Sequence, residues 1–493
     1  MIEKKKIDNF YKEWLKNLPK LSEGYIYDGN KNLRPTRDIF TYFKEVINKF
    51  LTDSIDEFEK IILLPGIRGV GKTTLLMQIF KIEKFLNHEN PLDVNILQNL
   101  NKLDYRFYFD ISRFHFEQIT LNDFFKFFER INNFDFVSLD RKVILLLDEI
   151  HFDERWSLFL KVLFDSTKGH KNLLVIATGS SAINLKISAD LMRRSKIAEI
   201  FPMKFNEYLV LRHNIFPLEN LSGVLQKILF DSKDARAVFS QLKETESKIN
   251  RFLINLPHEY EDDFFKNGGF PFIANIQSDV EIAERIENVI NGVIMKDIIT
   301  LKKFKTETVS KISDLLYLLS NTDIISYEKL LQTLRIDNIR TLTSLFDALV
   351  MSGLIVKVKS YGKTYGTTRK TPKYLFITPS IRSAILSGVF PSGVEGKKLE
   401  DYFVLIFEKD LKKTIAYKLL CDIAEGGADF ILTLSDRSNI IIETGFIKEE
   451  TKQVIKTMKK VINVRYGLVF GSDNLELVEN SIVKVPLKFL MLM

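Results

Sequence analysis

The sequence predicts an α/β fold in which a parallel sheet is followed by a helical region and two smaller folded regions. Three observations predict the sheet and a functional site at its edge. Short apolar stretches alternate with helical patterns between Ile61 and Phe201, which is typical of parallel strands joined by helices. The first stretch ends in a glycine-rich turn that opens a helix, and a later one ends in two adjacent acidic residues.

The composition is that of a folded globular protein and excludes several other classes. The 493 residues are 45% hydrophobic and 27% charged, and this length predicts about three domains. No apolar run reaches the ~20 residues of a membrane span, and no signal peptide is recognised, so we expect a cytoplasmic protein without membrane contact. The single Cys421 excludes an intramolecular disulfide and a multi-cysteine zinc site. The net charge of +7 leans mildly toward a polyanionic partner.

Changes of pattern along the chain divide it into five expected segments. The strand pattern is confined to the second and to the last two segments, and the Asn-rich stretch "NHENPLDVNILQNLNK" is expected to be a surface loop. The fourth segment has three helical patterns followed by two strands, "LIVKVKS" and "KYLFIT", which together predict a winged helix-turn-helix. The segments are an N-terminal helical segment 1–58, an α/β core 59–204, a helical subdomain 205–303, the winged helix 304–388 and a C-terminal α/β domain 392–493.

A phosphate-binding loop is predicted by "GIRGVGKT", which fits the pattern G-x-x-x-x-G-K-[ST]. It follows an apolar strand and opens a helix, so backbone N–H groups and the helix N-terminus can surround phosphate oxygens. Lys72 is expected to reach the β- and γ-phosphates of ATP, and the Thr73 hydroxyl is expected to bind Mg²⁺. The residues predicted to bind nucleotide are Gly66, Ile67, Arg68, Gly69, Val70, Gly71, Lys72, Thr73 and Thr74.

Two later strands supply the expected partners of this loop. "VILLLDEI" ends in Asp148, which can hold the Mg²⁺ shell, and Glu149, which can orient or deprotonate the attacking water. Thr178 or Ser180 in "VIATGSS" can sense the γ-phosphate, with a loop or helix-capping role as the alternative. The pattern therefore predicts hydrolysis of ATP.

Arg193 and Arg194 in "SADLMRRSKIAEI" are further catalytic candidates. An arginine can stabilise charge on the transferred phosphoryl group, from the same subunit or from a neighbour. The alternative is a solvated helix face or an ion-pair donor.

The stretches "LLPGIRGVGKTTLL", "LLLDEIHFDERW", "ATGSSAINL", "FPMKFNEYL" and "NGGFPFIA" resemble a group of AAA-type ATPases common in archaea and bacteria. The resemblance implies a P-loop core, a helical lid, a winged helix and a C-terminal domain similar to restriction-endonuclease-like PD-(D/E)XK folds. It also implies ATP, Mg²⁺, self-association as a homo-oligomer and a nucleic-acid or mobile-element context. Arg194 matches the arginine of the family's usual Gly-Arg, whereas Arg193 stands where the glycine would be.

The winged helix carries its positive charge on the expected wing. The expected base-reading helix, from about Asp337 to Met351, has only Arg340 on its early turns, so strong sequence specificity is not indicated. Basic side chains on a hairpin favour salt-dependent contacts with DNA phosphates, and a solvated hairpin in a packing domain is the alternative. The residues concerned are Lys357, Lys359, Lys363, Arg369, Lys370 and Lys373, interleaved with Tyr361, Tyr365 and Tyr374.

The stretch "GGADFILTLSDRSNIIIETGFIK" predicts a hairpin with a carboxylate on each strand. With "SDRSN" as the turn, Asp429 and Glu443 fall on one face within about 5–8 Å, close enough to share a hard cation. Glu400 on the preceding helix is a third candidate ligand. In the resembled fold the matching positions are a helical Glu, the Asp and an E-x-K.

The sequence departs from that pattern because Gly445 stands where the lysine belongs. Lys448 can reach back to the acids, and Gln453 can assist it. The domain is therefore either a metal nuclease with a relocated lysine or an inactive domain kept for packing or binding.

Two functions are compatible with these expectations. The first is an ATP-hydrolysing AAA-type machine that acts on or with DNA, with a nuclease-like C-terminal domain of doubtful activity. The second is a nucleotide-dependent signalling or regulatory switch whose C-terminal domains make protein contacts. Salt-dependent binding through the wing would favour the first.

Overall fold

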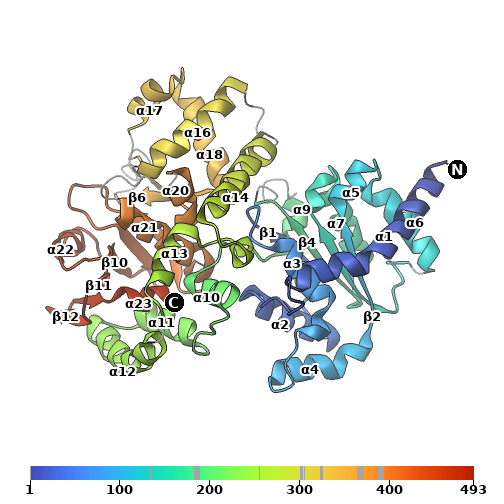
Figure 1. Cartoon of the computed structure of the whole chain (residues 1–493), viewed down its shortest axis with the longest axis horizontal. Helices are drawn as coiled ribbons and strands as arrows, with labels where there is room; N and C mark the ends of the chain where they lie inside the picture. The colour runs from blue at the N-terminus through green and yellow to red at the C-terminus, as the bar shows by residue number, and fades with distance from the viewer. Residues whose placement is uncertain are drawn as a thin grey trace. The chain divides into compact units, whose positions relative to one another are not determined.

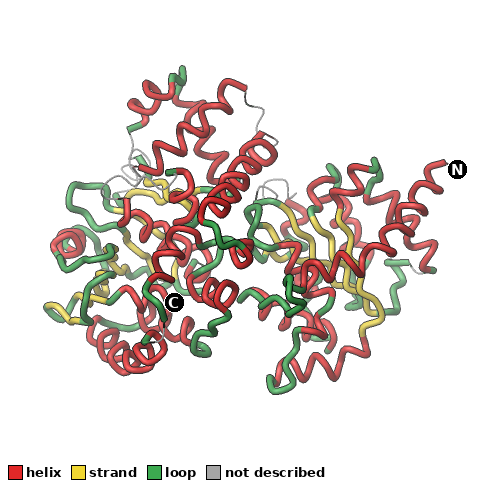
Figure 2. Tube along the Cα trace, viewed as in Figure 1, coloured by secondary structure: helices red, strands yellow, loops and turns green. Residues whose placement is uncertain are grey.

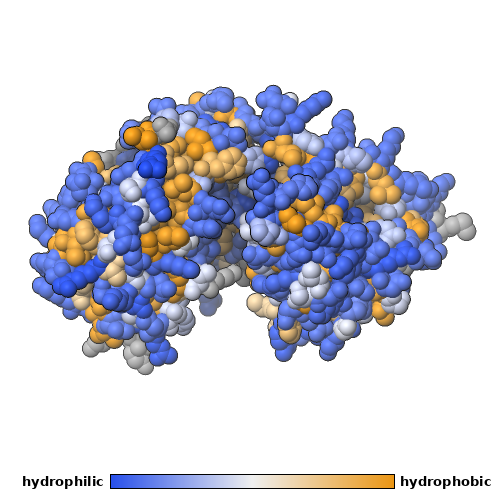
Figure 3. Space-filling view, turned by 90° about the horizontal axis from the view of Figure 1, so that it is seen from below, coloured by the Kyte–Doolittle hydropathy of each residue, from blue (hydrophilic) through white to orange (hydrophobic). Residues whose placement is uncertain are grey.

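The computed structural model describes residues 2–133, 135–181, 189–254, 256–299, 304, 306–321, 326–362, 371–386, 394–412 and 414–493. The chain folds into two compact units, Met1–Ile200 and Phe201–Met493, drawn in Figure 1. No helix in the described part of the chain is long and apolar enough to cross a membrane. On the face drawn in Figure 3, hydrophilic residues cover most of the surface, and apolar residues gather in smaller patches.

The first unit is built on a parallel sheet, which confirms the expected fold of the core. Its five strands follow the order β2-β3-β4-β1-β5, so β4 lies between the strand of the glycine-rich turn and the acidic strand. Strands β1, β3 and β4 are buried along their whole length, which explains their continuous apolar sequences. The strands are β1 (Ile61–Pro65), β2 (Leu103–Asp110), β3 (Lys142–Asp148), β4 (Leu173–Gly179) and β5 (Lys196–Ile197).

Helices surround this sheet, as the tube drawing in Figure 2 shows. Helix α3 packs on β2, β3 and β4, and α1 packs on α3 and α6. The helices are α1 (Ile2–Ile26), α2 (Ile39–Leu51), α3 (Lys72–Phe80), α4 (Pro91–Asn99), α5 (Ile111–Phe116), α6 (Leu121–Asn132), α7 (Trp156–Ser166) and α9 (Ala189–Met192). Short 3₁₀ turns are η1 (Glu57–Glu59), η2 (Ile82–Lys84), η3 (Leu100–Lys102) and η4 (Ile150–Phe152).

The Asn-rich stretch is not the surface loop that its composition predicts, because it contains helix α4. The Asn90 side chain accepts hydrogen bonds from the backbone N–H groups of Leu92 and Asp93, and Pro91 occupies the first helical position. An asparagine cap followed by proline is a helix-start signal that outweighs the local polarity.

The second unit begins with helices, and no strand occurs among its described residues up to 299, as the pattern predicts. These are α10 (Phe205–His213), α11 (Leu221–Asp231), α12 (Ala235–Leu253), α13 (Glu259–Asn267), η5 (Pro271–Asn275), α14 (Asp279–Gly292) and the π-helix η6 (Val293–Ile298). Helices α16 (Thr306–Asn321), α17 (Tyr327–Leu334) and α18 (Ile339–Met351) gather at one end of this unit in Figure 1.

The rest of the second unit is an eight-stranded mixed sheet in the order β12-β13-β11-β10-β9-β8-β6-β7. The strands are β6 (Ile355–Ser360), β7 (Lys373–Phe376), β8 (Ala416–Cys421), β9 (Phe430–Leu434), β10 (Asn439–Thr444), β11 (Val464–Phe470), β12 (Glu476–Val478) and β13 (Ile482–Val485). The helices are α20 (Pro379–Ile385), α21 (Val394–Ile406) with its π-helical continuation η7 (Phe407–Leu411), α22 (Lys452–Met458) and α23 (Leu487–Met491).

The hairpin β6–β7 is part of this sheet, because β6 pairs in parallel with β8 at Lys359–Leu420 and Ser360–Cys421. The expected winged helix and the C-terminal segment therefore share one sheet, which the sequence pattern does not predict. Of the expected wing, Lys363, Tyr365, Arg369 and Lys370 lie outside the described residues.

A buried ion pair joins the hairpin to the C-terminal helix α21. The Arg382 guanidinium on α20 donates to both oxygens of Asp401 on α21, at 2.6 and 2.9 Å. Asp401 Oδ1 also accepts the backbone N–H of Phe376 on β7 at 2.8 Å. Arg382 donates further to the carbonyl of Ser320 in α16 at 2.9 Å. Four elements are thus tied together at one fully buried point.

Candidate functional site

The predicted phosphate-binding loop connects β1 to α3. Gly71 takes a left-handed backbone conformation, φ +92°, as the N-cap of α3, and a side chain there would be strained. A Cβ atom on Gly66 would lie 2.5 Å from the Ile200 side chain and 2.6 Å from its carbonyl oxygen, so only glycine fits. The first N–H groups of α3 have no partner within the helix, and this end is therefore suited to bind an anion.

Lys72 lies buried against the same loop. Its Nζ donates to the carbonyl oxygens of Gly66 at 2.9 Å and Ile67 at 3.3 Å. These contacts solvate an ammonium group that is only 5% exposed. A positive charge is thereby held beside the N-terminus of α3, where phosphate binding requires it.

Asp148 is the centre of a hydrogen-bonded cluster at the strand ends. Its Oδ2 accepts from Thr73 Oγ1 at 2.7 Å, and its Oδ1 accepts from Thr178 Oγ1. Thr178 Oγ1 in turn accepts the backbone N–H of Glu149 at 2.9 Å. The structure therefore brings together four residues that the sequence predicts, because β4 lies between β1 and β3. The Thr73 hydroxyl beside the Asp148 carboxylate is an oxygen donor set that fits Mg²⁺.

Glu149 has a strained backbone, with φ +50° and ψ +44° in the left-handed region. Such a conformation in a non-glycine residue costs on the order of 1–3 kcal/mol and is concentrated at functional sites. The bond from its N–H to Thr178 stabilises this conformation. Its Oε2 lies 3.3 Å from Nδ1 of His151.

Two further residues support this cluster, and the sequence motifs do not identify them. Tyr108 on β2 donates its hydroxyl to Asp148 Oδ2 at 3.0 Å, and the Trp14 indole donates to the Tyr108 carbonyl at 2.9 Å. Burial first, and then the charges of Asp148 and Asp110, raise the pKa of Tyr108, so it stays a neutral donor. A tyrosine near the end of the strand next to the acidic strand is the signal that could have indicated it. Arg37, before α2, donates to the Val70 carbonyl at 2.8 Å and so restrains the loop.

The two arginines of "MRRS" are placed differently from each other. Arg194 Nε lies 2.8 Å from Asp165 Oδ1 on α7, and its Nη1 donates to the Asp190 carbonyl at 2.8 Å. Arg193 is 77% exposed and lies 3.3 Å from Asp190. The described contacts of Arg194 are thus with α7 and α9, and its catalytic role stays a prediction.

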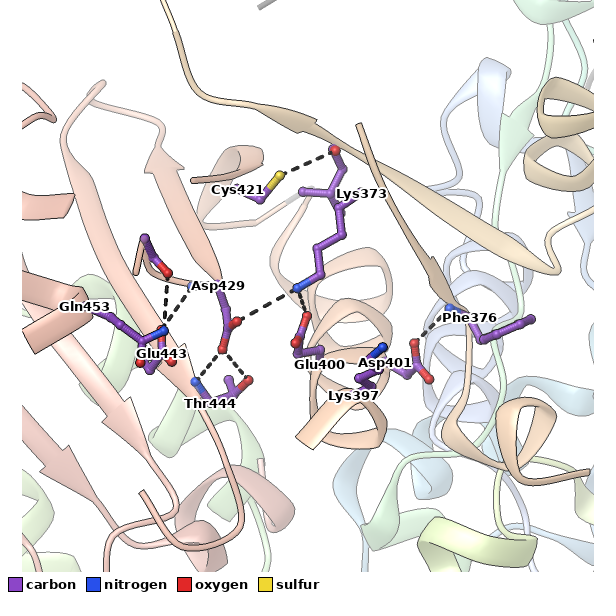
Figure 4. Close-up of polar contacts among 12 residues, drawn as sticks. Lys373, Phe376, Lys397, Glu400, Asp401, Cys421, Asp429, Glu443, Thr444 and Gln453 are labelled. Atoms are coloured by element: carbon purple, nitrogen blue, oxygen red, sulfur yellow. Dashed lines mark hydrogen bonds and ion pairs between the residues drawn. The ribbon is translucent and has the colours of Figure 1, made fainter. Parts of the chain in front are cut away.

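A second cluster of charged residues lies at the C-terminal sheet (Figure 4). Ile442 pairs with Phe430, which places Glu443 opposite Asp429 as the hairpin pattern predicts. The Asp429 N–H donates to Glu443 Oε2 at 3.1 Å, and the Thr444 N–H donates to Asp429 Oδ2 at 2.9 Å. The Thr444 hydroxyl adds a second bond to that oxygen at 3.0 Å. The two carboxylates are therefore held by the backbone of the facing strand.

Lys448 reaches back to Glu443, as the sequence suggests. Its Nζ lies 2.9 Å from Glu443 Oε1 and donates to Gln453 Oε1 at 2.7 Å. A Cβ atom on Gly445 would lie 3.1 Å from the Lys448 Cβ, so the lysine stem lies across the glycine. Burial and the charge of Asp429 raise the pKa of Glu443 to about 7, while Lys448 opposes the shift.

Lys373 is not a phosphate-contacting residue of the wing as predicted, because its side chain is buried. Its ammonium is ion-paired with Glu400 on α21 and lies 3.8 Å from Asp429 Oδ1. Tyr374 is also buried, with its hydroxyl 3.0 Å from that of Tyr327. The prediction fails for Lys373 because it faces the acids of the C-terminal segment, and for Tyr374 because it packs on α17 and α18 on the other face of β7.

The predicted metal ligands Glu400, Asp429 and Glu443 do not form a common ligand set in this structure. The residues that the structure describes contain no group of three or more Asp, Glu, His or Cys side chains arranged to hold a metal ion. Lys373 lies between Glu400 and Asp429 instead, and Lys448 is paired with Glu443. Nuclease chemistry at these residues stays a prediction.

The remaining basic residues of the expected wing that are described lie at the surface. Lys357 and Lys359 on β6 are exposed, as is Arg340 on α18, whereas Tyr361 is half-buried and packs on the core of the C-terminal sheet. Lys357 and Lys359 flank the buried Val358, so both side chains leave the same face of the hairpin.

Comparison with known families and relatives agrees with the geometry of the first unit. Residues 58–209 match a family model described as an AAA domain, and residues 259–392 match a domain of unknown function, DUF8612. "Uncharacterized protein MJ1637" of Methanocaldococcus jannaschii is 34% identical over 470 residues, covering 94% of this chain and 90% of that protein. An "Uncharacterized protein" of Haemophilus influenzae is 25% identical over 338 residues, covering 66% and 68%.

Similar solved structures include DnaA from Aquifex aeolicus bound to AMPPCP and the RuvB branch migration motor of Thermotoga maritima. DnaA is 16% identical with a TM-score of 0.26, over 64% of this chain and 88% of that chain. RuvB is 13% identical with a TM-score of 0.25, over 66% and 90%.

The match to MJ1637 covers nearly the full length of both proteins, and the AAA model spans the sheet that carries Lys72, Asp148 and Thr178. The chain therefore belongs to the family of the Methanocaldococcus jannaschii protein MJ1637, and its first unit contains an AAA-type ATPase domain.

Proposed function

We propose that this protein hydrolyses ATP at the loop between β1 and α3 and acts on or with DNA. The observation that carries hydrolysis is the chain of hydrogen bonds from Thr73 through Asp148 and Thr178 to Glu149. It gathers a metal-binding hydroxyl, a metal-binding carboxylate and a candidate base at one edge of the sheet. A site that only binds nucleotide does not require the base.

The residues of the proposed ATP site have distinct roles in hydrolysis. The N–H groups at the start of α3 and the ammonium of Lys72 bind and orient the phosphates of ATP. Thr73 and Asp148 would hold Mg²⁺, which when bound neutralises charge on the phosphate oxygens. Glu149 accepts a proton from the water that attacks the γ-phosphorus, and His151 lies beside the Glu149 carboxylate.

The loop is tested by ATP binding to the Lys72→Ala variant. We expect binding weaker by about tenfold or more, since hydrogen bonds to charged groups contribute ~1.5–3 kcal/mol. Lys102→Ala, which removes an exposed lysine beside β2, is the matched control and should bind ATP normally. Unchanged binding by Lys72→Ala would refute the assignment of the loop.

The DNA part of the proposal is supported by the exposed Lys357, Lys359 and Arg340 and by the net charge of +7. Phosphate contacts give affinity that falls steeply with salt. We therefore expect salt-sensitive binding of duplex DNA, weakened and made less salt-sensitive in Lys357→Gln/Lys359→Gln. Salt-independent or absent binding would favour the second candidate, a nucleotide-dependent signalling switch whose C-terminal regions contact proteins.

Self-association is part of the same proposal. Arg194, which matches the family's arginine, is the candidate to stabilise charge on ATP of its own subunit or of a neighbouring copy, and the exposed Arg193 lies beside it in the chain. Sedimentation velocity with and without ATP tests it, and a monomer under both conditions would count against it.

In the same proposal, the C-terminal region is a nuclease-like domain. The contact of Lys448 with Glu443 supports a relocated lysine, whereas the lysine-paired acids support a domain that does not cleave. Plasmid cleavage in Mg²⁺ or Mn²⁺, with and without ATP, separates the two. Activity lost in both Glu443→Ala and Lys448→Ala would establish the nuclease, and no cleavage under any condition would leave a packing or binding domain.

A further inference from the structure

Lys373 stands at the centre of the carboxylate cluster in the second unit, although it comes from a different part of the chain. It is the first residue of β7, and its ammonium lies between Glu400 on α21 and Asp429 at the start of β9, as Figure 4 shows. The side chain is 8% exposed and its Nζ lies 5.5 Å from the centre of the Phe430 ring. A positive charge thus occupies the position from which one cation could contact both carboxylates.

The second oxygen of Asp429 and both oxygens of Glu443 are engaged by donors of the chain itself. Asp429 Oδ2 accepts from the N–H and hydroxyl of Thr444, and Glu443 Oε2 accepts from the Asp429 N–H. Glu443 Oε1 is paired with Lys448 at 2.9 Å. Burying three carboxylates together is costly unless their charge is compensated. Two lysines supply that compensation in the folded chain without a metal.

The position of Lys373 is fixed by a rigid support. Three residues further along β7, the Phe376 N–H is bound to Asp401, which the buried Arg382 holds with two hydrogen bonds. Asp401 follows Glu400 directly on α21. The strand that carries the ammonium and the helix that carries its carboxylate are therefore fixed to each other, so the pairing is part of the fold.

A divalent cation at this place would need carboxylate oxygens at about 2.0–2.6 Å. It would lie close to the Lys373 ammonium, and the two positive charges would repel each other in a site largely shielded from water. We propose that Lys373 is a built-in cation that closes the cluster of Glu400, Asp429 and Glu443 to divalent metal ions.

The test is the binding of Mn²⁺ to the full chain without nucleotide. Binding is measured by calorimetry and by the electron paramagnetic resonance signal of free Mn²⁺. Lys373→Met keeps the length of the side chain and removes its charge. We expect Lys373→Met to bind one Mn²⁺ more per chain than the wild type. The affinity of its cluster for Mn²⁺ should be at least about tenfold higher than that of the wild-type cluster. Adding Asp429→Asn should abolish the gain. Lys418→Met, which removes an exposed lysine on β8, should behave as the wild type.

Two results would overturn the proposal. The first is a wild-type Mn²⁺ site that Asp429→Asn removes, and the second is a folded Lys373→Met protein without the additional ion. Lys373→Gln, which keeps a hydrogen-bond donor, provides a second variant. A variant that unfolds in chelator but folds when Mn²⁺ is added supports the proposal, and one that stays unfolded in Mn²⁺ counts against it. The readout is cation binding, so failure of ATP hydrolysis, DNA binding or DNA cleavage leaves the outcome unaffected.

Discussion

Asp148 accepts hydrogen bonds from three hydroxyl groups, and only those of Thr73 and Thr178 belong to residues that the motifs predict. The third comes from Tyr108, which limits the orientations of the carboxylate. Tyr108→Phe removes that bond alone. We expect the Mg²⁺ concentration for half-maximal ATPase activity to rise about tenfold, since a hydrogen bond to a charged group contributes ~1.5–3 kcal/mol.

The matched control for this prediction is Tyr105→Phe. Tyr105 lies on the same strand, but it is 38% exposed and its hydroxyl accepts from Arg141 at 2.9 Å. Its Mg²⁺ dependence should equal that of the wild type. If Tyr108→Phe shows the wild-type Mg²⁺ dependence as well, Tyr108 does not position Asp148.

The raised pKa of Glu443 predicts that the second unit becomes less stable as pH rises. Its pKa is raised from 4.5 to about 7 in the folded state, so the folded protein binds this proton more tightly than the unfolded chain. The stabilisation is complete below about pH 4.5 and is lost as pH rises through 7. We expect the second unit to lose up to about 3 kcal/mol over that window, and less in Glu443→Gln.

Urea unfolding at pH 5 and pH 7.5, followed by far-UV circular dichroism, measures this change. Tryptophan fluorescence is an internal control, because Trp14 and Trp156 are the two tryptophans of the chain and both lie in the first unit. An equal pH slope of the dichroism transition in the wild type and Glu443→Gln would contradict the prediction.

Among single residues, those of the ATP site could be predicted because their pattern is local. The loop from Gly66 to Thr74 is contiguous, and Asp148 and Glu149 end one apolar run. Tyr108 and Lys373 could not, because each acquires its role from a strand or helix distant in sequence. An isolated tyrosine or lysine in a strand gives no indication of which carboxylate the fold places beside it.

At the scale of elements, the ion pair of Arg382 and Asp401 joins α20, α21, β7 and α16. Asp401→Asn leaves the guanidinium buried without its charged partner, which costs about 3–5 kcal/mol. We expect a loss of that size in the free energy of unfolding of the second unit. Glu408→Gln, which breaks the solvent-facing pair with Lys412, is the control and should change stability by under about 1 kcal/mol. Equal losses in the free energy of unfolding for Asp401→Asn and Glu408→Gln would show that the buried ion pair does not stabilise the unit.

Elements were predictable where periodicity and caps agree. The buried strands β1, β3 and β4 are uninterrupted apolar runs, and the apolar runs of β9 and β10 flank a clear turn. Helix α4 was missed because its polarity suggested a loop, although Asn90 and Pro91 form a helix-start signal. The pairing of β6 with β8 was missed because it joins segments about sixty residues apart, and local patterns carry no information on such contacts.

At the scale of the whole molecule, the proposed ATP hydrolysis belongs to the first unit and the proposed contacts with DNA belong to the second. The central claim is that Glu149 activates the attacking water. The most direct measurement is the rate of phosphate release from ATP by Glu149→Gln, with ATP binding measured on the same sample. Glu154→Gln, an exposed acid nearby, is the matched control.

We predict that Glu149→Gln binds ATP as the wild type does but releases phosphate at least about 100-fold more slowly, the contribution expected of a general base. Glu154→Gln should keep the wild-type rate. Phosphate release by Glu149→Gln at the wild-type rate, or its absence from the wild-type protein in Mg²⁺, would contradict the account.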